Sequence, residues 1–124
     1  MRITTIKKKS IDIAIVTSDE VLIKDVQSAL NLMATVQYKT GCNRIILNKS
    51  SIIDDFFDLK TKVAGEILQK FINYRVKLAI VGDFSIYTSK SLKAFITESN
   101  QWNDIIYVGS NEEAIEKLSA DGRV

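Results

Sequence analysis

Beyond a short N-terminal stretch, the sequence alternates between segments with helical periodicity and short apolar segments typical of strands. Helices are predicted within 19–40, at about 55–74, near 89–99 and at 111–120, separated by strands at 44–48, 76–81 and 105–108. Such alternation places successive strands parallel in one sheet, joined by right-handed helical crossovers. This feature restricts the chain to an α/β fold.

Two β-rich segments, at 2–6 and 11–16, precede the alternation. The link between them, "KKKS", is too short for a helical crossover, so these segments are expected to form an antiparallel hairpin. The sequence has no proline, internal repeat or linker-like stretch. We therefore predict one layered domain over 1–124, with an N-terminal β-hairpin and a sheet of about five strands.

Side chains on a strand alternate between two faces, and the predicted strands differ from face to face. At 11–16, isoleucines occupy one face and smaller or polar side chains the other; the strands at 44–48 and 76–81 also have one bulkier face. A sheet covered by helices on both sides is apolar on both. We expect helices mainly on one face. The other face is then covered by terminal segments or the first helix, or by a second copy in a homodimer.

Several residues mark predicted helix ends. Gly41 is placed to stop the first helix, and Ser110 with Glu113 forms a capping box for the last, with Gly122 just beyond it. Lys7 to Lys9 suit a solvated turn that blocks edge-to-edge aggregation. Trp102 falls in a polar stretch, where we expect it to be partly exposed or to anchor a loop.

Composition excludes several kinds of chemistry. The chain has no histidine, so a Ser–His or Cys–His nucleophile and an imidazole zinc site are ruled out. The net charge of +2 gives no strong attraction to nucleic acid, and no apolar run approaches the roughly 20 residues that cross a bilayer. The N-terminus lacks the apolar core of a secretion signal, and Cys42 is the only cysteine. We expect a cytoplasmic protein without a cofactor or membrane contact.

Polar segments follow the predicted parallel strands: "TSDE" after Val16, "NKSS" after Leu47, "GDFS" after Val81 and "GS" after Val108. Ligands of open parallel sheets bind beyond the carboxyl ends of the strands, where these segments would form one rim. The residues predicted to meet a ligand or partner there are Asn48, Lys49, Ser50, Ser51, Asp54, Asp55, Asp58, Gly82, Asp83, Phe84, Ser85 and Tyr87. The alternative is that the polar residues of these segments, Ser18, Asp54 or Asp55, Ser89 and Ser110, only cap helices.

The stretch "DDFFD", Asp54 to Asp58, is predicted to open the longest helix. Its three carboxylates could hold a hard cation together with Asp83, or could simply suit the positive end of the helix dipole. The dipole interpretation is favoured because no calcium-loop spacing is present, and no metal site is predicted. Phe56 and Phe57 are consecutive, so in a helix only one of them would face the core.

Two long stretches, "DVQSALNLMATVQYKTGCNRIILNK" and "DFFDLKTKVAGEILQKFINYRVKLAIVGDFS", resemble an uncharacterised bacterial family, the domain of unknown function 4180. With the hairpin and "YTSKSLKAFITESN", the resemblance covers nearly the whole chain. The order of elements is also similar to STAS domains of anti-sigma factor antagonists, a superhelix of βα units. STAS domains are switched by phosphorylation of a serine or threonine after the third strand. Here Ser50 and Ser51 come early and Thr61 late, so the switch motif is missing.

Two functions from different classes are compatible with this sequence. The first is a non-enzymatic regulatory or binding module whose rim meets a protein partner or a small anionic ligand. The second is a small enzyme, with or without magnesium, that uses Lys49, Asp83 and Tyr87 as acid, base or electrostatic groups. The first is favoured because the sequence contains no nucleophile with a positioned base and no glycine-rich phosphate loop.

Overall fold

The computed structural model describes residues 1–120 and confirms the predicted α/β alternation. Gly122 lies outside the described residues. The strands are β1 (Arg2–Lys8), β2 (Ile11–Thr17), β3 (Arg44–Asn48), β4 (Lys77–Val81) and β5 (Ile105–Val108). The α-helices are α1 (Val26–Thr40), α2 (Val63–Asn73), α3 (Lys90–Trp102) and α4 (Asn111–Ala120). Three short 3₁₀ turns lie between β3 and α2: η1 (Lys49–Ser51), η2 (Asp54–Phe57) and η3 (Leu59–Thr61).

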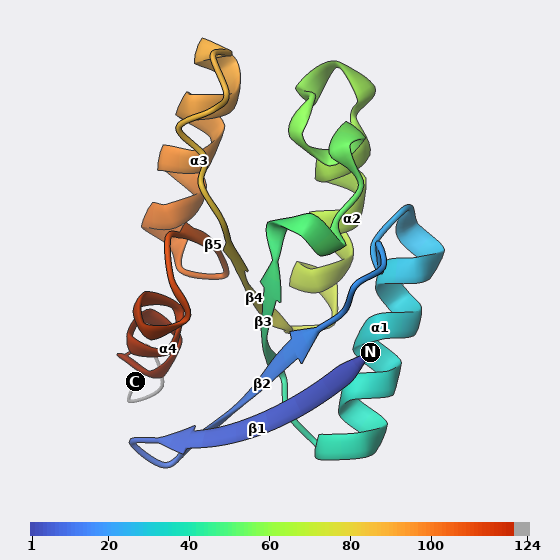
Figure 1. The fold of residues 1–124 in the computed structure, drawn as a ribbon, viewed down its shortest axis with the longest axis vertical. Helices are drawn as coiled ribbons and strands as arrows, with labels where there is room; N and C mark the ends of the chain where they lie inside the picture. Colours follow the sequence, from blue (N-terminus) through green and yellow to red (C-terminus); the bar gives the residue numbers. More distant parts are fainter. Residues whose placement is uncertain (121–124) are drawn as a thin grey trace.

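The five strands form one sheet in the order β1-β2-β3-β4-β5, so each strand pairs with its neighbour in the chain (Figure 1). The β1–β2 hairpin is antiparallel and the other pairings are parallel. Val16 is in register with Leu47, and Val81 is in register with Asn48 and with Val108. The four parallel strands therefore end at one edge, which we call the carboxyl edge.

One face of the sheet is covered by α1, α2 and α3, as the prediction of helices mainly on one face requires. Ala14, Ile45, Leu78 and Ile105 occupy adjacent positions on this face. They pack in one core with buried residues of the three helices, among them Val36, Ile67, Phe71 and Leu92. The α1 helix ends at Gly41, whose φ of 73° is left-handed, as the sequence predicts.

The opposite face is covered by α4, the terminal element of the described chain. Ala114 and Leu118 of α4 pack on Ile13, Ile46 and Ile106. The prediction that one face is bulky and the other smaller was wrong in detail: the β2 isoleucines share the α4 face with Ala79, whereas Ala14 shares the first face with Leu78. Alternation within one strand does not determine which residues of the next strand join it, because this depends on register.

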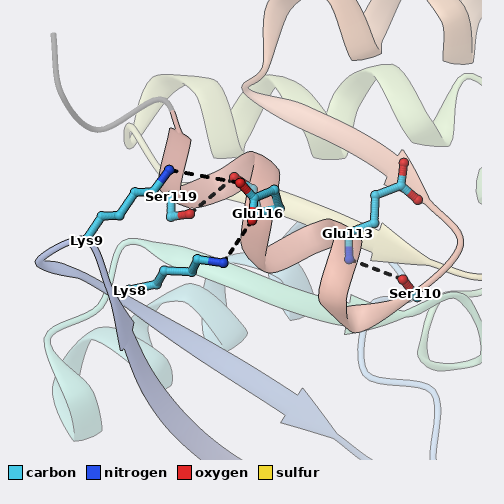
Figure 2. Close-up of polar contacts among 6 residues, drawn as sticks. All are labelled: Lys8, Lys9, Ser110, Glu113, Glu116 and Ser119. Atoms are coloured by element: carbon cyan, nitrogen blue, oxygen red, sulfur yellow. Dashed lines mark hydrogen bonds and ion pairs between the residues drawn. The ribbon is translucent and has the colours of Figure 1, made fainter.

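The hairpin turn and α4 are joined by charged contacts (Figure 2). Lys8 Nζ donates to Glu116 Oε1 at 2.8 Å, and Lys9 Nζ lies 3.9 Å from Glu116 Oε2. At the start of α4, the Glu113 N–H donates to Ser110 Oγ, and Glu113 Oε1 accepts from the Gly109 N–H. The predicted cap is therefore present, and Lys8 at the end of β1 and Lys9 in the turn both contact α4.

The Glu116→Gln variant is expected to show a pH-dependent loss of stability. The hydrogen bond from Lys8, followed by the charges of Lys8 and Lys9, lowers the pKa of Glu116. A carboxylate whose pKa is lowered on folding stabilises the protein above its unfolded pKa of about 4.3, and this contribution is lost as the pH falls through the folded pKa. We expect a slightly lower melting temperature than the parent at pH 7 and no difference at pH 2.

Thermal unfolding followed by circular dichroism measures this effect, with Glu20→Gln as the control. Glu20 is exposed and makes no ion pair with any residue in 1–120. An equal loss in both variants, or a Glu116→Gln effect that persists at pH 2, would show that the lysine contacts do not stabilise α4.

Candidate functional site

Lys49 crosses directly over Gly82 at the carboxyl edge. A Cβ atom built on Gly82 would lie 2.7 Å from Lys49 Cβ, closer than real Cβ contacts, so only glycine fits beneath this side chain. The Gly82 N–H donates to the Val108 carbonyl at 3.0 Å and so remains tied to the end of β5. Two predicted rim residues that are far apart in sequence thus form one packed unit.

The ammonium group of Lys49 is held against aromatic rings. Lys49 Nζ donates to Tyr87 Oη at 3.1 Å and lies 5.1 Å from the centroid of the Tyr87 ring and 5.8 Å from that of Phe57. The rings of Phe57 and Tyr87 are stacked, with centroids 5.4 Å apart. A cation over a ring face is attracted by the ring quadrupole. The half-buried Lys49 is therefore oriented by its neighbours.

These rings belong to an aromatic cluster formed by Phe56, Phe57, Phe84, Tyr87 and Tyr107. Phe56 and Phe57 are both buried, which corrects the prediction that only one of them faces the core. A 3₁₀ turn followed by an extended residue allows what a continuous α-helix would not. The cluster joins the loop before α2 to the loop after β4.

Tyr107 lies at the base of the cluster. Its ring meets Phe84 edge-on, with centroids 5.4 Å apart, and its side chain is buried. Within residues 1–120 its hydroxyl has no hydrogen-bond partner. Burial raises the pKa of this phenol, which therefore stays neutral.

The loop after β4 is shaped by Asp83. Its Oδ1 accepts hydrogen bonds from the Ser85 N–H at 2.9 Å and from Ser85 Oγ at 2.6 Å. These bonds are the main cause of the lowered pKa of Asp83, and the nearby charge of Lys49 contributes less. Asp83 is therefore an ionised residue that folds its own loop, and its Oδ1 is already engaged.

The carboxylates at Asp54 to Asp58 do not open a helix, which corrects that prediction. They lie in η2 and at the start of η3; α2 begins only at Val63, after Lys62 with a φ of 65°, and the longest helix is α1. The segment between η1 and η2 is fixed instead by the segment before α1, because the Ile53 N–H donates to the Ile23 carbonyl at 2.9 Å. No group of three acidic or cysteine side chains in residues 1–120 could hold a metal ion.

Several predicted rim residues support the loops. Asn48 Oδ1 accepts from the Ser50 N–H, and Asp58 Oδ1 accepts from the Lys60 N–H. Ser51 is buried, and its carbonyl accepts from two N–H groups in the segment before α1. Asp54 and Asp55 are exposed in η2. Asn48 and Asp58 therefore cap the turns η1 and η3. Ser89 and Ser110 cap α3 and α4, as the capping alternative predicts, whereas Asp54 and Asp55 lie in η2, whose start has no side-chain cap. Lys49, Gly82, Phe84 and Tyr87 come together.

A cavity of about 670 Å³ lies beside this unit. Its wall includes Phe57 and Tyr87 from the aromatic cluster, and polar groups from Asp58, Lys60, Thr88, Ser89 and Ser91. Sequence reasoning did not place Phe57, Lys60 or Ser91 at the site. The available signal was the run of hydroxyls from Ser85 to Ser91, which continues past the predicted rim to the start of α3. We refer to Lys49, Tyr87 and this cavity as the Lys49 site.

No helix in the described part of the chain is long and apolar enough to cross a membrane. No curated protein and no solved structure gives a significant match to this sequence. One family model does match, that of the domain of unknown function DUF4180, over residues 8–118. The match spans the chain from the end of β1 to α4 and includes every residue of the Lys49 site. The chain therefore belongs to the DUF4180 family.

Proposed function

We propose that this protein is a non-enzymatic regulatory or binding module of the cytoplasm, and that its Lys49 site binds an anionic group. That group, a phosphate or carboxylate, is carried by a small molecule or by a partner protein. The strongest support is a cavity of about 670 Å³ whose wall contains Lys60 and Tyr87. Lys49 is not a wall residue, but its ammonium donates to Tyr87 Oη at 3.1 Å and so places a second cation next to the wall. The order of elements, similar to that of STAS domains, agrees with a regulatory role.

The charges around the cavity favour an anion. Lys60 contributes a cation to the wall, and Thr88, Ser89 and Ser91 contribute hydroxyl donors. The cavity also borders the start of α3, where the helix dipole is positive and the first turn contains no acidic residue. One carboxylate, Asp58, lies in the wall, and its Oδ1 already accepts from the Lys60 N–H.

The site is also organised before any ligand arrives. Phe57 and Tyr87 stack on each other, Ser89 Oγ accepts from the Leu92 N–H, and Asp83 fixes the loop that leads to Tyr87. Groups that are already ordered lose little conformational entropy on binding, so more of their interaction energy appears as affinity. The ordered side chains of the Lys49 site therefore suit the binding of a ligand or partner.

Titration with two probes tests the proposal. Inorganic phosphate represents a small ligand, and a short oligoglutamate peptide represents an acidic partner segment; backbone amide signals are followed by NMR. We expect saturable shifts at residues 57–60 and 86–92 with at least one probe. Tighter binding of phosphate indicates a small ligand, and tighter binding of the peptide indicates a protein. Lys49→Met and Lys60→Met should each weaken binding by about tenfold, the loss expected for a charge-assisted hydrogen bond.

Lys39→Met is the matched control, because Lys39 is an exposed lysine in the last turn of α1, away from the carboxyl edge. Its affinity for either probe should equal that of the parent. The proposal fails if neither probe gives saturable shifts, or if Lys39→Met weakens binding as much as the site variants do.

The enzyme alternative is supported by a single observation, the hydrogen bond between Lys49 Nζ and Tyr87 Oη. A lysine beside a phenol is a pair that acid–base chemistry can use. Magnesium ions or a nucleotide that raised the melting temperature in proportion to the logarithm of concentration would favour an enzyme over a phosphate- or peptide-binding module.

A further inference from the structure

In residues 1–120, one buried polar side-chain atom has no hydrogen-bond partner, the hydroxyl oxygen of Tyr107. Tyr107 is 5% exposed and lies one residue before the end of β5, at the carboxyl edge. Burying a hydroxyl without a partner destabilises the folded protein, and a phenylalanine here would keep the packing of the ring without that cost. The fold alone therefore does not account for this hydroxyl.

The other aromatic residues with a polar atom are either exposed or paired. Tyr38 and Tyr74 are exposed, and the hydroxyl of the half-buried Tyr87 is hydrogen-bonded as described above. Trp102, which the sequence predicts to be partly exposed or to anchor a loop, is 72% exposed at the end of α3. Among the four tyrosines of the chain, Tyr107 thus differs in keeping an unpaired hydroxyl away from water.

The backbone of Tyr107 is held on both sides. Its N–H donates to Asn100 Oδ1 at 2.7 Å, and Asn100 Nδ2 donates to its carbonyl at 3.1 Å, so one side chain of α3 binds both groups. On the other side, Tyr107 is in register with Ile80 of β4. A partner for the hydroxyl must therefore come from whatever covers the ring, because β5 itself is fixed.

One of the residues that cover Tyr107 is Phe84, from the loop between β4 and α3. Its ring meets that of Tyr107 edge-on, with centroids 5.4 Å apart, and lies 6.1 Å from Phe57 and 6.4 Å from Tyr87. Phe57 and Tyr87 line the cavity of the Lys49 site, whereas Phe84 is not a wall residue. Phe84 thus contacts both the buried tyrosine and the aromatic wall of the cavity.

Phe84 can leave this position by rotation of its side chain. It is half-buried, and its segment of the chain belongs to no helix or strand. The backbone on either side of it is held, because Asp83 Oδ1 accepts from both the N–H and the Oγ of Ser85. Side chains move between staggered rotamers without a change in the backbone. The place of the Phe84 ring can therefore be vacated while the loop keeps its shape.

We propose, building on the function proposed above, that Phe84 occupies the place of a ligand ring and that the Tyr107 hydroxyl is the group that recognises this ring. The ligand is then a small anion with a heteroaromatic ring. Its acidic group meets Lys49, and its ring replaces that of Phe84 beside Phe57 and Tyr87. A ring nitrogen or ring carbonyl accepts a hydrogen bond from Tyr107, which the phenyl ring of Phe84 cannot do.

Tyr107→Phe separates this role from a structural one, because it removes a single oxygen atom. The urea concentration at the midpoint of unfolding should rise, since an unpaired buried hydroxyl is lost. The affinity for pyridine-3-carboxylate, measured by NMR titration, should fall about fivefold, the value of one hydrogen bond. The affinity for inorganic phosphate, which has no ring, should equal that of the parent. Tyr38→Phe is the matched control and should change none of these, because its hydroxyl is already exposed.

Benzoate has the shape and charge of pyridine-3-carboxylate but lacks the ring nitrogen. The parent should bind benzoate about fivefold more weakly, and Tyr107→Phe should bind the two probes equally. Phe84→Ala vacates the place of the ring. This variant should bind pyridine-3-carboxylate at least about threefold more tightly than the parent, because the ligand no longer competes with Phe84.

A Tyr107→Phe variant that unfolds at a lower urea concentration would mean that the hydroxyl is paired in the free protein, by a buried water for example, and would overturn the proposal. No saturable binding of pyridine-3-carboxylate, equal affinities of the parent for it and benzoate, or no tighter binding by Phe84→Ala would also overturn it. If phosphate still shifts residues 57–60 and 86–92 in that case, only the ring site fails. The function proposed above fails separately, when neither phosphate nor oligoglutamate binds.

Discussion

Phe71→Ala is expected to lower the free energy of unfolding by about 3–5 kcal/mol, the usual cost of removing a buried phenylalanine. Phe71 is fully buried in α2, within the core that joins α1, α2 and the sheet. The variant loses the transfer free energy of the ring and leaves a cavity that its neighbours fill only partly. Such a loss is a large part of the stability of a domain of this size.

Urea unfolding followed by circular dichroism measures this change. The control is Tyr38→Ala, because Tyr38 is 90% exposed on α1 and its removal should change the free energy of unfolding by less than about 0.5 kcal/mol. A Phe71→Ala loss below about 1 kcal/mol would mean that α2 does not pack on the sheet as the structure describes.

Gly82→Ala is expected to damage both the fold and the Lys49 site. The new methyl group would lie 2.7 Å from Lys49 Cβ, an atom near the backbone that cannot swing away as the end of a side chain can. Overpacking of this kind costs about 1–3 kcal/mol. Relief of the clash should move the Lys49 backbone and break the 3.1 Å hydrogen bond to Tyr87.

The matched control is Gly109→Ala, at the same edge of the sheet. A Cβ atom there would lie 3.9 Å from Glu113 Oε1, an ordinary contact, so stability should change little. The two variants are compared by urea unfolding and by the NMR shifts of residues 57–60 and 86–92. Unchanged stability and unchanged shifts in Gly82→Ala would show that Lys49 does not pack over Gly82.

Much of this fold could be predicted from periodicity. The strands expected at 44–48 and 105–108 and the helix at 111–120 have the observed bounds of β3, β5 and α4. The segment before α2 is different, because its apolar residues continue the helical spacing and yet it forms 3₁₀ turns. A bridge between Ile23 and Ile52 holds the start of this segment, and Lys62 with its φ of 65° separates it from the helix. Tertiary contacts of this kind are not visible in local spacing.

The candidate site, like the fold, has one part that could be predicted from the sequence and one part that could not. That the polar segments meet at one edge follows from parallel strands, and the structure brings Lys49, Gly82 and Tyr87 together there. The stacking of Phe57 on Tyr87 depends on the conformations of two loops that are thirty residues apart, 87 − 57 = 30. Neither loop conformation follows from a repeating pattern, so Phe84 and Tyr87 could be expected at the rim but the stacking of Phe57 on Tyr87 could not be predicted.

The order of strands in the sheet has a consequence for how the chain folds during synthesis on the ribosome. Each strand pairs with the one made just before it, so every new strand–helix unit finds its docking edge already formed. The sheet face that α4 covers is buried much later in synthesis. Ile13 is among the first core residues to emerge, and its cover, Leu118, emerges more than a hundred residues later, 118 − 13 = 105. For most of translation this isoleucine-rich face therefore remains exposed to solvent. It is the surface through which a nascent chain is most prone to aggregate.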